Sequence, residues 1–321
     1  MKSFSGKIAV VTGGGTGMGR ELVRQLAAEG CHVSMCDVSN ENMQQTKTLA
    51  EQGAPRGTRV HTHVADVSSE ADLLAFRTAV AEAHEADHVN LVFNNAGIGG
   101  GGSLIESPRE EWEKTFDVCW YGVYFGTRTF LPMLIASEEG HLVNTSSVNG
   151  FWASLGPMTA HTAYSAAKFA VKGFTEALIN DCKLHAPHVK VSLVMPGHIG
   201  TSIIINSQRM LGNDPKEMSD EKVEQARERL TRMGWPVKDA TNAQIRQALV
   251  VWGEQFRDAA PMTAAQAAKV ILDGVKAERW RILVGKDAEV MDRLVREKPE
   301  DAYGQEFIER LRAEVPWGLG G

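Results

Sequence analysis

Short apolar runs alternate with helical patterns along most of the chain. The runs are short and continuous, as expected of strands that are buried on both faces. The predicted strands are Ile8–Thr12, His32–Cys36, Arg59–Val64, Asn90–Phe93, His141–Thr145, Val189–Val194 and Arg281–Val284. The predicted helices cover residues 17–29, 40–52, 69–85, 109–136 and 162–185. This alternation predicts an α/β fold, a doubly wound parallel sheet with helices on both faces.

The composition is that of an ordinary globular protein. The 321 residues are 43% hydrophobic and 23% charged, and no linker or repeat divides them, so we predict a single domain over residues 1–321. The net charge of −6, with no basic block, argues against nucleic acid or an anionic membrane as a partner. No apolar run approaches the ~20 residues of a membrane span. Because the start has no signal-peptide pattern and the four cysteines have no C-x-x-C spacing, we expect a cytoplasmic protein with reduced thiols.

Residues 206–260 differ from the rest because they are polar and contain no strand pattern. Two amphipathic helices are predicted there. Their apolar faces are Val223, Ala226, Leu230 and Met233 in the first, and Ile245, Leu249, Trp252 and Phe256 in the second. We favour a helical cap insertion over the carboxyl ends of the strands, where open α/β sheets bind ligands. The alternative is a surface excrescence around a small core of its own. Residues 286–321 form a C-terminal extension.

A glycine-rich turn, T-G-G-G-T-G-M-G at residues 12–19, follows the first strand and opens a helix. Small residues there let backbone N–H groups approach a pyrophosphate, and the helix N-terminus adds positive potential. The turn therefore predicts a dinucleotide site.

Asp37 ends the second strand, where its carboxylate could accept hydrogen bonds from the adenosine ribose and repel a 2′-phosphate. Its neighbours Val38 and Ser39 carry no positive charge. These residues favour NAD over NADP as the cofactor. The alternative for Asp37 is a helix N-cap or a turn residue.

Tyr164 and Lys168 are four residues apart on a predicted helix and therefore share one face. A free tyrosine titrates near pH ~10, and a nearby lysine cation favours the phenolate and lowers that pKa. The pair can move a proton to or from an alcohol oxygen, which Ser147 could hold by a hydrogen bond. Beside a dinucleotide site, this indicates hydride transfer between a carbinol carbon and nicotinamide. The alternative is an ordinary helix that happens to carry a Tyr and a Lys.

Together these residues resemble the short-chain dehydrogenase/reductase family, which has a Rossmann-type sheet. Five motifs carry the resemblance: T-G-x-x-x-G-x-G at 12–19, N-N-A-G at 94–97, N-T-S-S at 144–147, Y-x-x-x-K at 164–168 and P-G-x-I-x-T at 196–201. The resemblance covers residues 5–205 strongly and 262–285 weakly. It does not cover 206–260 or the tail past 286.

The resemblance implies roles for individual residues. Tyr164 would be the general acid/base, Lys168 would hold the nicotinamide ribose and lower the pKa of Tyr164, and Ser147 would polarise the substrate carbonyl. The implied cofactor-binding residues are Gly13, Thr16, Gly17, Met18, Gly19, Asp37, Asp66, Val67, Asn95, Ala96, Gly97, Tyr164, Lys168, Pro196, Gly197, Ile199 and Thr201.

Four of these have a particular place. Asp66 and Val67 would flank the adenine, and Ile199 and Thr201 would meet the nicotinamide carboxamide. For Asn94 and Asn95, hydrogen bonding at the end of the sheet is an alternative that can coexist with lining the cofactor cleft.

The chain departs from the family pattern at Cys119, which stands where the family usually carries Asn in V-N-x-x-G. The resemblance implies that an Asn at this position anchors a water in a proton relay, and a thiol is only a weak donor and acceptor. The helix backbone could still hold the water. The spacing from Ser147 to Tyr164 is also longer than in many relatives, and the added residues near 151–158 are apolar. They are expected either to form a wall of the substrate pocket or to pack on a partner subunit.

The histidines do not indicate a metal. The pairs His61/His63 and His84/His88 have no third ligand in view, so no metal site is predicted. His198, inside the 196–201 motif, is expected to face the cofactor cleft.

We therefore predict a NAD-dependent oxidoreductase that interconverts a secondary alcohol and a ketone, with a bulky hydrophobic or aromatic substrate. A homo-oligomer, a tetramer or a dimer, is expected from the resemblance and from the apolar surface of the long helices predicted over 109–136 and 162–185. Tyr121, Tyr124 and Phe125 add aromatic surface to the first of these helices. The alternative is a non-catalytic dinucleotide-binding redox sensor or scaffold, which Cys119 supports. Epimerisation or dehydration through a transient ketone is a third possibility on the same fold.

Overall fold

The computed structural model describes residues 1–156, 159–232 and 234–315. A seven-stranded sheet runs through it with the order β3-β2-β1-β4-β5-β6-β9, and every pair of neighbours is parallel. The strands are β1 (Ile8–Thr12), β2 (His32–Asp37), β3 (Val60–Val64), β4 (Leu91–Asn94), β5 (Gly140–Thr145), β6 (Val189–Pro196) and β9 (Arg281–Val284). The order reverses between β1 and β4, which is the point where doubly wound sheets open a crevice for ligands. The predicted fold class is confirmed.

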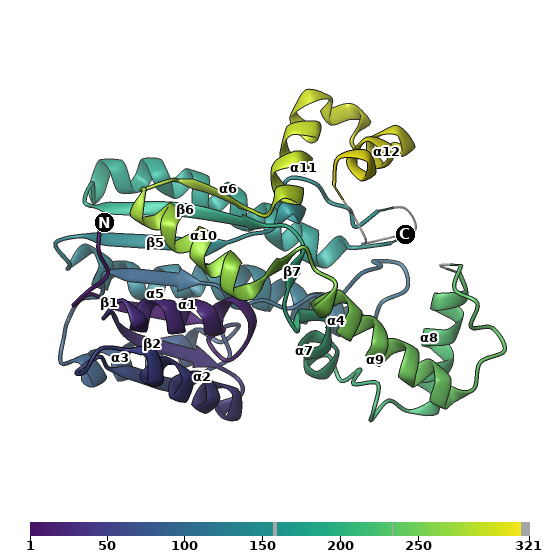
Figure 1. The fold of residues 1–321 in the computed structure, drawn as a ribbon, viewed down its shortest axis with the longest axis horizontal. Coiled ribbons are helices and arrows are strands. Elements are labelled where there is room, and N and C mark those ends of the chain that lie inside the picture. The colour runs from purple at the N-terminus through teal and green to yellow at the C-terminus, as the bar shows by residue number, and fades with distance from the viewer. Residues whose placement is uncertain (157–158, 233, 316–321) are drawn as a thin grey trace.

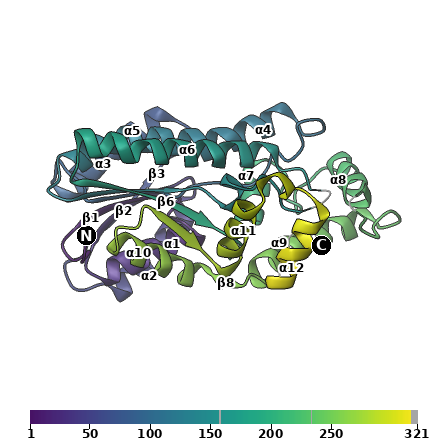
Figure 2. The same ribbon diagram turned by 90° about the horizontal axis from the view of Figure 1, so that it is seen from above.

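Helices cover both faces of the sheet (Figure 2). One face carries α3 (Glu70–His84), α5 (Gly122–Ile135) and α6 (Thr162–His185), and the other carries α1 (Gly17–Ala28), α2 (Asn40–Gly53) and α10 (Ala264–Lys276). A second, two-stranded sheet pairs β7 (Ile199–Gly200) with β8 (Met262–Thr263). β8 leads into α10, which begins at a capping box formed by Thr263 and Gln266.

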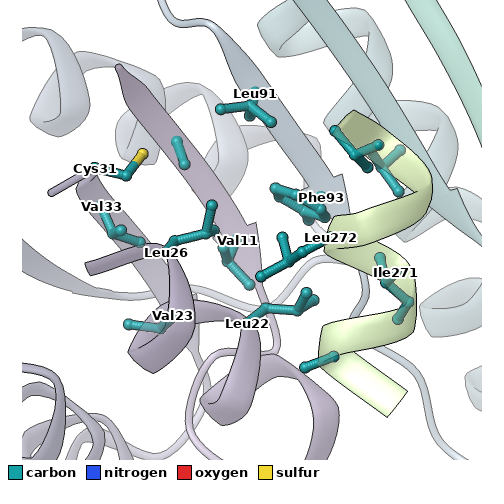
Figure 3. Close-up of a cluster of buried hydrophobic side chains, with 14 of the residues drawn as sticks. Val11, Leu22, Val23, Leu26, Cys31, Val33, Leu91, Phe93, Ile271 and Leu272 are labelled. Atoms are coloured by element: carbon teal, nitrogen blue, oxygen red, sulfur yellow. The ribbon is translucent and has the colours of Figure 1, made fainter. Parts of the chain in front are cut away.

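The core between β1, β4, α1 and α10 is an apolar cluster whose side chains interlock in Figure 3. Leu22 and Leu26 lie one turn apart on α1, so they share the face that meets Leu272 of α10. Burial of each such side chain stabilises the fold by about 1.5–3 kcal/mol. This packing fixes the start of α1, and with it the glycine turn, against the carboxyl end of β1.

The helix predicted over residues 109–136 is interrupted. It consists of α4 (Arg109–Phe116), a π-helical turn, η1 (Asp117–Tyr121), and α5. The apolar pattern continues through η1, so the sequence gives no sign of the extra residue in this turn. Such π-turns are frequent at functional sites, and Cys119 lies in this one.

The two helices predicted in residues 206–260 are present as α8 (Asp220–Arg232) and α9 (Asn242–Asp258). Their predicted apolar faces meet in one cluster, apart from the surface position of Trp252 and the contact of Phe256 with His198. Met233 of the first predicted face lies outside the described residues. Figure 1 shows α8 and α9 extending beyond the sheet, next to a further helix, α7 (Ile203–Met210). A Cβ at Gly253 of α9 would lie 3.0 Å from Ile205 of α7, so these helices pack closely.

The C-terminal extension folds into α11 (Lys286–Glu297), a short 3₁₀ turn, η3 (Pro299–Asp301), and α12 (Gln305–Glu314). These elements build a separate apolar cluster, which also takes in Val148 and Trp152 from the segment after β5. Figure 1 shows α11 and α12 side by side, beyond β6.

Candidate active site

The glycine turn after β1 leaves room for a ligand to approach the backbone. Gly13 has φ +67°, and a Cβ there would lie 2.8 Å from the Cα of Ala96, while a Cβ at Gly19 would overlap the Gly13 carbonyl oxygen. The first turn of α1 has no acidic residue, and its N-cap, Thr16, makes no side-chain cap. The first N–H groups of α1 are therefore free of a capping side chain, as a pyrophosphate site requires. The turn fits a dinucleotide.

Thr12 joins this turn to the segment after β4. Its hydroxyl accepts hydrogen bonds from the backbone N–H groups of Asn95 (3.0 Å) and Ala96 (3.1 Å). The Asn95 amide donates back to the Thr12 carbonyl at 3.1 Å. Asn94 lies deeper and donates to Asn144 at 2.9 Å across the sheet. The alternative role given to the two asparagines, hydrogen bonding at the end of the sheet, is thus present.

Asp37 lies at the carboxyl end of β2, beside the turn. Its carboxylate accepts hydrogen bonds from the backbone N–H groups of Gly15 and Ser39, each at 3.0 Å. The adjacent Val38 is half-exposed, and no cation contacts the Asp37 carboxylate among the described residues. Asp37 is therefore a turn residue whose carboxylate lies against the glycine turn.

Asp66 and Val67 follow β3. The Asp66 carboxylate accepts hydrogen bonds from Lys114 Nζ at 2.6 Å and from the Ser68 hydroxyl at 2.6 Å. Although burial acts in the opposite direction, these donors hold the pKa of Asp66 below its usual range. Val67 is buried against Gly122. The carboxylate of Asp66 is thus already engaged by its own chain, which the sequence did not indicate.

Ser147, Tyr164 and Lys168 come together at the carboxyl end of β5. The hydroxyls of Ser147 and Tyr164 share a hydrogen bond, and Lys168 Nζ lies 5.4 Å from the centroid of the Tyr164 ring. Lys168 is buried and donates to the Thr145 carbonyl at 2.9 Å. A Cβ at Gly97 would lie 3.5 Å from Lys168 Nζ. The predicted proton-transferring residues are therefore in contact with one another and with the segment that Thr12 binds.

The protonation state of Tyr164 differs from the expectation. Burial raises the pKa of Tyr164, Cys119 raises it further, and the hydrogen bond with Ser147 opposes the rise. Burial also lowers the pKa of Lys168. The expected lowered pKa of Tyr164 is wrong for this structure, because desolvation of the buried phenol is the largest influence on it. Tyr164 is consequently a protonated phenol at neutral pH.

His161 was not singled out by the sequence, yet its ring centroid lies 4.7 Å from that of Tyr164. Burial lowers the pKa of His161 to about 4, so the imidazole is neutral. A hollow of about 540 Å³ lies next to it, lined also by Ala153 and Phe169.

Cys119 is fully buried in η1, and its thiol donates to the Ile98 carbonyl at 3.1 Å. Burial raises the pKa of Cys119, while nearby Lys168 opposes the rise. The thiol is therefore neutral, and it lies near Lys168 Nζ, since a Cβ at Gly97 would contact both atoms. Whether it fills the relay position stays a prediction.

The 196–201 motif spans the end of β6 and β7. Gly197 donates to the Val284 carbonyl at 2.9 Å, and Ile199 is buried. Thr201 faces the glycine turn, since a Cβ at Gly17 would lie 3.2 Å from its side chain. The expectation that His198 faces the cofactor cleft is wrong. Its Nε2 forms a hydrogen bond with the Phe256 carbonyl of α9 at 2.7 Å, and its ring packs on the Phe256 ring.

Helix α7 adds residues that the sequence did not single out. Asn206 donates to the Thr16 hydroxyl at 3.1 Å, and Ser207 accepts a hydrogen bond from Gly99 N–H at 2.8 Å. The first bond holds α7 against the glycine turn, and the second holds it against the segment after β4. Neither residue belongs to a motif, so no sequence signal pointed to them.

The apolar residues near 151–158 do not follow either expectation in full. Trp152 is completely buried, not against a partner subunit but against the chain's own extension, where its indole donates to the Ala302 carbonyl at 2.7 Å. Ala153 does line the hollow beside His161. Pro157 and Met158 lie outside the described residues.

Within residues 1–156, 159–232 and 234–315, no group of three or more His, Cys, Asp or Glu side chains is arranged to hold a metal ion. In the same part of the chain, no helix is both long and apolar enough to cross a membrane.

Comparison with known proteins gives consistent matches. The family model described as short chain dehydrogenase matches residues 7–211. The chain is 35% identical over 297 residues to the putative oxidoreductase SadH of Mycobacterium tuberculosis, covering 92% of each protein. It is 33% identical over 220 residues to levodione reductase of Leifsonia aquatica, covering 68% of this chain and 79% of the relative.

Solved structures give the same picture. A short chain dehydrogenase/reductase from Burkholderia phymatum in complex with NAD superposes with a TM-score of 0.74 at 29% identity, covering 94% of this chain and 96% of that one. A metagenomic short-chain oxidoreductase in complex with NADP superposes with a TM-score of 0.54 at 31% identity, covering 60% and 83%.

Proposed function

The chain belongs to the short-chain dehydrogenase family of oxidoreductases that bind a nicotinamide dinucleotide, and we propose that it uses NAD to interconvert a secondary alcohol and a ketone. The observation that carries the proposal is the contact of the Ser147 hydroxyl, the Tyr164 phenol and the buried Lys168 beside the glycine turn. A hydroxyl donor, a proton donor and a cation at one place suit a reaction in which an oxygen gains or loses a proton.

When bound, the nicotinamide would accept or supply the hydride. The chain's own residues would control the oxygen. Ser147 accepts a hydrogen bond from Asn149 N–H at 3.1 Å, so its own proton is left to donate toward Tyr164 or a substrate oxygen. A protonated Tyr164 is ready to give its proton to a ketone oxygen during reduction. In oxidation it would have to ionise first, and a lysine cation close to the phenol would favour that step.

NAD is the favoured cofactor. The Asp37 carboxylate lies where the adenosine ribose of a dinucleotide would be read, and a 2′-phosphate would meet its negative charge. The exposed neighbour Val38 offers no compensating cation. The NAD complex of the Burkholderia relative supports this choice, and the NADP complex of the metagenomic relative makes the choice worth testing directly.

The substrate would be bulky and largely apolar. The hollow beside His161 is lined by Ala153 and Phe169, together with Thr159, Thr162 and Ser165, none of which is charged, and the neutral imidazole of His161 adds no charge. Helices α7 to α9 would form the cap over the open end of the cleft. The name of the levodione reductase relative also fits a ketone reductase.

The chain would assemble as a homo-oligomer in the cytoplasm. Tyr121 leaves aromatic surface exposed on η1, and such aromatic area is a usual component of interfaces. All four cysteines are free, which suits a reducing compartment.

The decisive experiment is a screen of NAD with secondary alcohols of increasing apolar size, followed by the absorbance of reduced nicotinamide. Primary alcohols of matched size are the control. We expect turnover with bulky secondary alcohols. A protein that binds the dinucleotide but turns over no alcohol or ketone in the panel would instead be the sensor or scaffold that Cys119 first suggested.

A further inference from the structure

We propose that the C-terminal extension, Lys286–Val315, acts as a clamp: it holds in place the two chain segments that border the reaction site, one after β5 and one after β6. Asp287 and Trp152 are its positioning residues. The kinetic part of this inference, an effect on kcat, rests on the proposed function. The binding part, an effect on the affinity for NADH, does not. The extension lies outside the matched family region, which ends at residue 211.

The first grip is on the segment after β6. Asp287, in the first turn of α11, is buried, and its carboxylate accepts a hydrogen bond from His198 N–H at 2.6 Å. Gly197 must lack a side chain here, because a Cβ would overlap the same carboxylate. The backbone of residues 197–198 is therefore held against α11 by this hydrogen bond. Thr201, three residues after His198, is the part of this segment that faces the glycine turn.

The second grip is on the segment after β5. The Trp152 indole is completely buried, donates to the Ala302 carbonyl at 2.7 Å and lies 5.2 Å from the Phe307 ring, measured between centroids. The side-chain amide of Asn149 donates to the Trp152 carbonyl at 3.0 Å and to the Ser154 carbonyl at 2.7 Å. Asn149 therefore ties the backbone around Trp152 to the turn that follows β5.

The same asparagine reaches the reaction site through its backbone. Asn149 N–H donates to the Ser147 hydroxyl at 3.1 Å. A continuous path of hydrogen bonds therefore runs from the extension, through Trp152 and Asn149, to Ser147. Apolar packing supports the path, because the cluster around Val148 and Trp152 is made largely of residues 288–315.

The binding part is tested by the affinity for NADH, measured from the fluorescence of the nucleotide. Asp287→Ala removes the acceptor of His198 N–H, and we expect the Kd to rise at least about fivefold. Asp287→Asn keeps an acceptor oxygen and is expected to stay within about twofold of the unmodified protein. The control is Asp301→Ala, which removes an exposed aspartate of the same extension. An unchanged Kd in Asp287→Ala, or an equal loss in Asp287→Asn, would overturn this grip.

The kinetic part is tested by Trp152→Phe, which keeps an aromatic ring but loses the donor to Ala302. We expect kcat to fall about fivefold with the Kd for NADH unchanged, and the exposed Trp280→Phe to change neither. Melting temperatures are measured for every variant. A role in stability alone predicts a lower melting temperature with kcat and Kd unchanged, and that result would overturn the clamp. If the unmodified protein shows no turnover, the proposed function fails while the NADH arm still decides the first grip.

Discussion

His141 should make the fold sensitive to acid. It is buried in β5, and its Nε2 lies 2.8 Å from the Ser192 hydroxyl. That hydroxyl donates its only proton to the Arg279 carbonyl at 2.6 Å, so His141 Nε2 must be the donor to Ser192. The neutral ring therefore has its lone pair on Nδ1, which is buried and has no hydrogen-bond partner among the described residues.

Protonation would place an N–H group on this buried atom without an acceptor. Burial, aided by the N-terminal ammonium, accordingly lowers the pKa of His141 from 6.5 to about 4. The unfolded chain then binds more protons than the folded one between these two values, so stability falls as the pH drops from 6.5 toward 4. The full difference between the unfolded and folded pKa values of His141 corresponds to about 3 kcal/mol in the free energy of unfolding. About 2 kcal/mol of this is lost between pH ~7 and pH ~4.5.

The measurement is urea unfolding at these two pH values. His141→Gln keeps an amide donor for Ser192 and has no titrating ring, so its loss of stability on acidification should be smaller by about 2 kcal/mol. The control is His185→Gln, which removes a histidine that is 76% exposed and should leave the loss unchanged. If His141→Gln and the unmodified protein lose equal stability between the two pH values, the reasoning is refuted.

Three further predictions concern the cofactor, the unusual cysteine and the assembly. NAD should be preferred over NADP by at least about tenfold, or ~1.4 kcal/mol, and Asp37→Ala with Val38→Arg should shift the preference toward NADP; equal kcat/KM values in the unmodified protein would defeat this. Cys119→Asn should raise kcat or leave it unchanged, because an amide can also donate to the Ile98 carbonyl; a large loss of rate at unchanged thermal stability would contradict it. Light scattering at micromolar concentration should show an oligomer, and a monomer would overturn that expectation.

The sheet could be predicted because each strand is a short apolar run whose two faces are both covered. Val10 of β1 and Val92 of β4 are fully buried in this way. The end of β6 could not be predicted from its own residues. The strand continues to Pro196 because that residue pairs with Val284 of β9. The π-turn η1 escaped prediction because one extra residue leaves the apolar pattern of Val118 and Val123 intact.

The site could be predicted where a motif fixes the residues, and not where tertiary contacts do. The approach of Ser147, Tyr164 and Lys168 follows from strand and helix positions. The contact of Asn206 with Thr16 joins distant segments and leaves no pattern in the sequence. The pKa of Tyr164 also could not be read from the neighbouring lysine, because its direction depends on how completely the folded chain excludes water.

The most direct test of the proposed chemistry is Tyr164→Phe, measured for both turnover and affinity for NADH. The phenol handles the proton and contributes little to cofactor binding, so turnover should fall by about 10²–10⁴ while the Kd for NADH stays within a few-fold. Turnover within a few-fold of the unmodified protein would contradict the account.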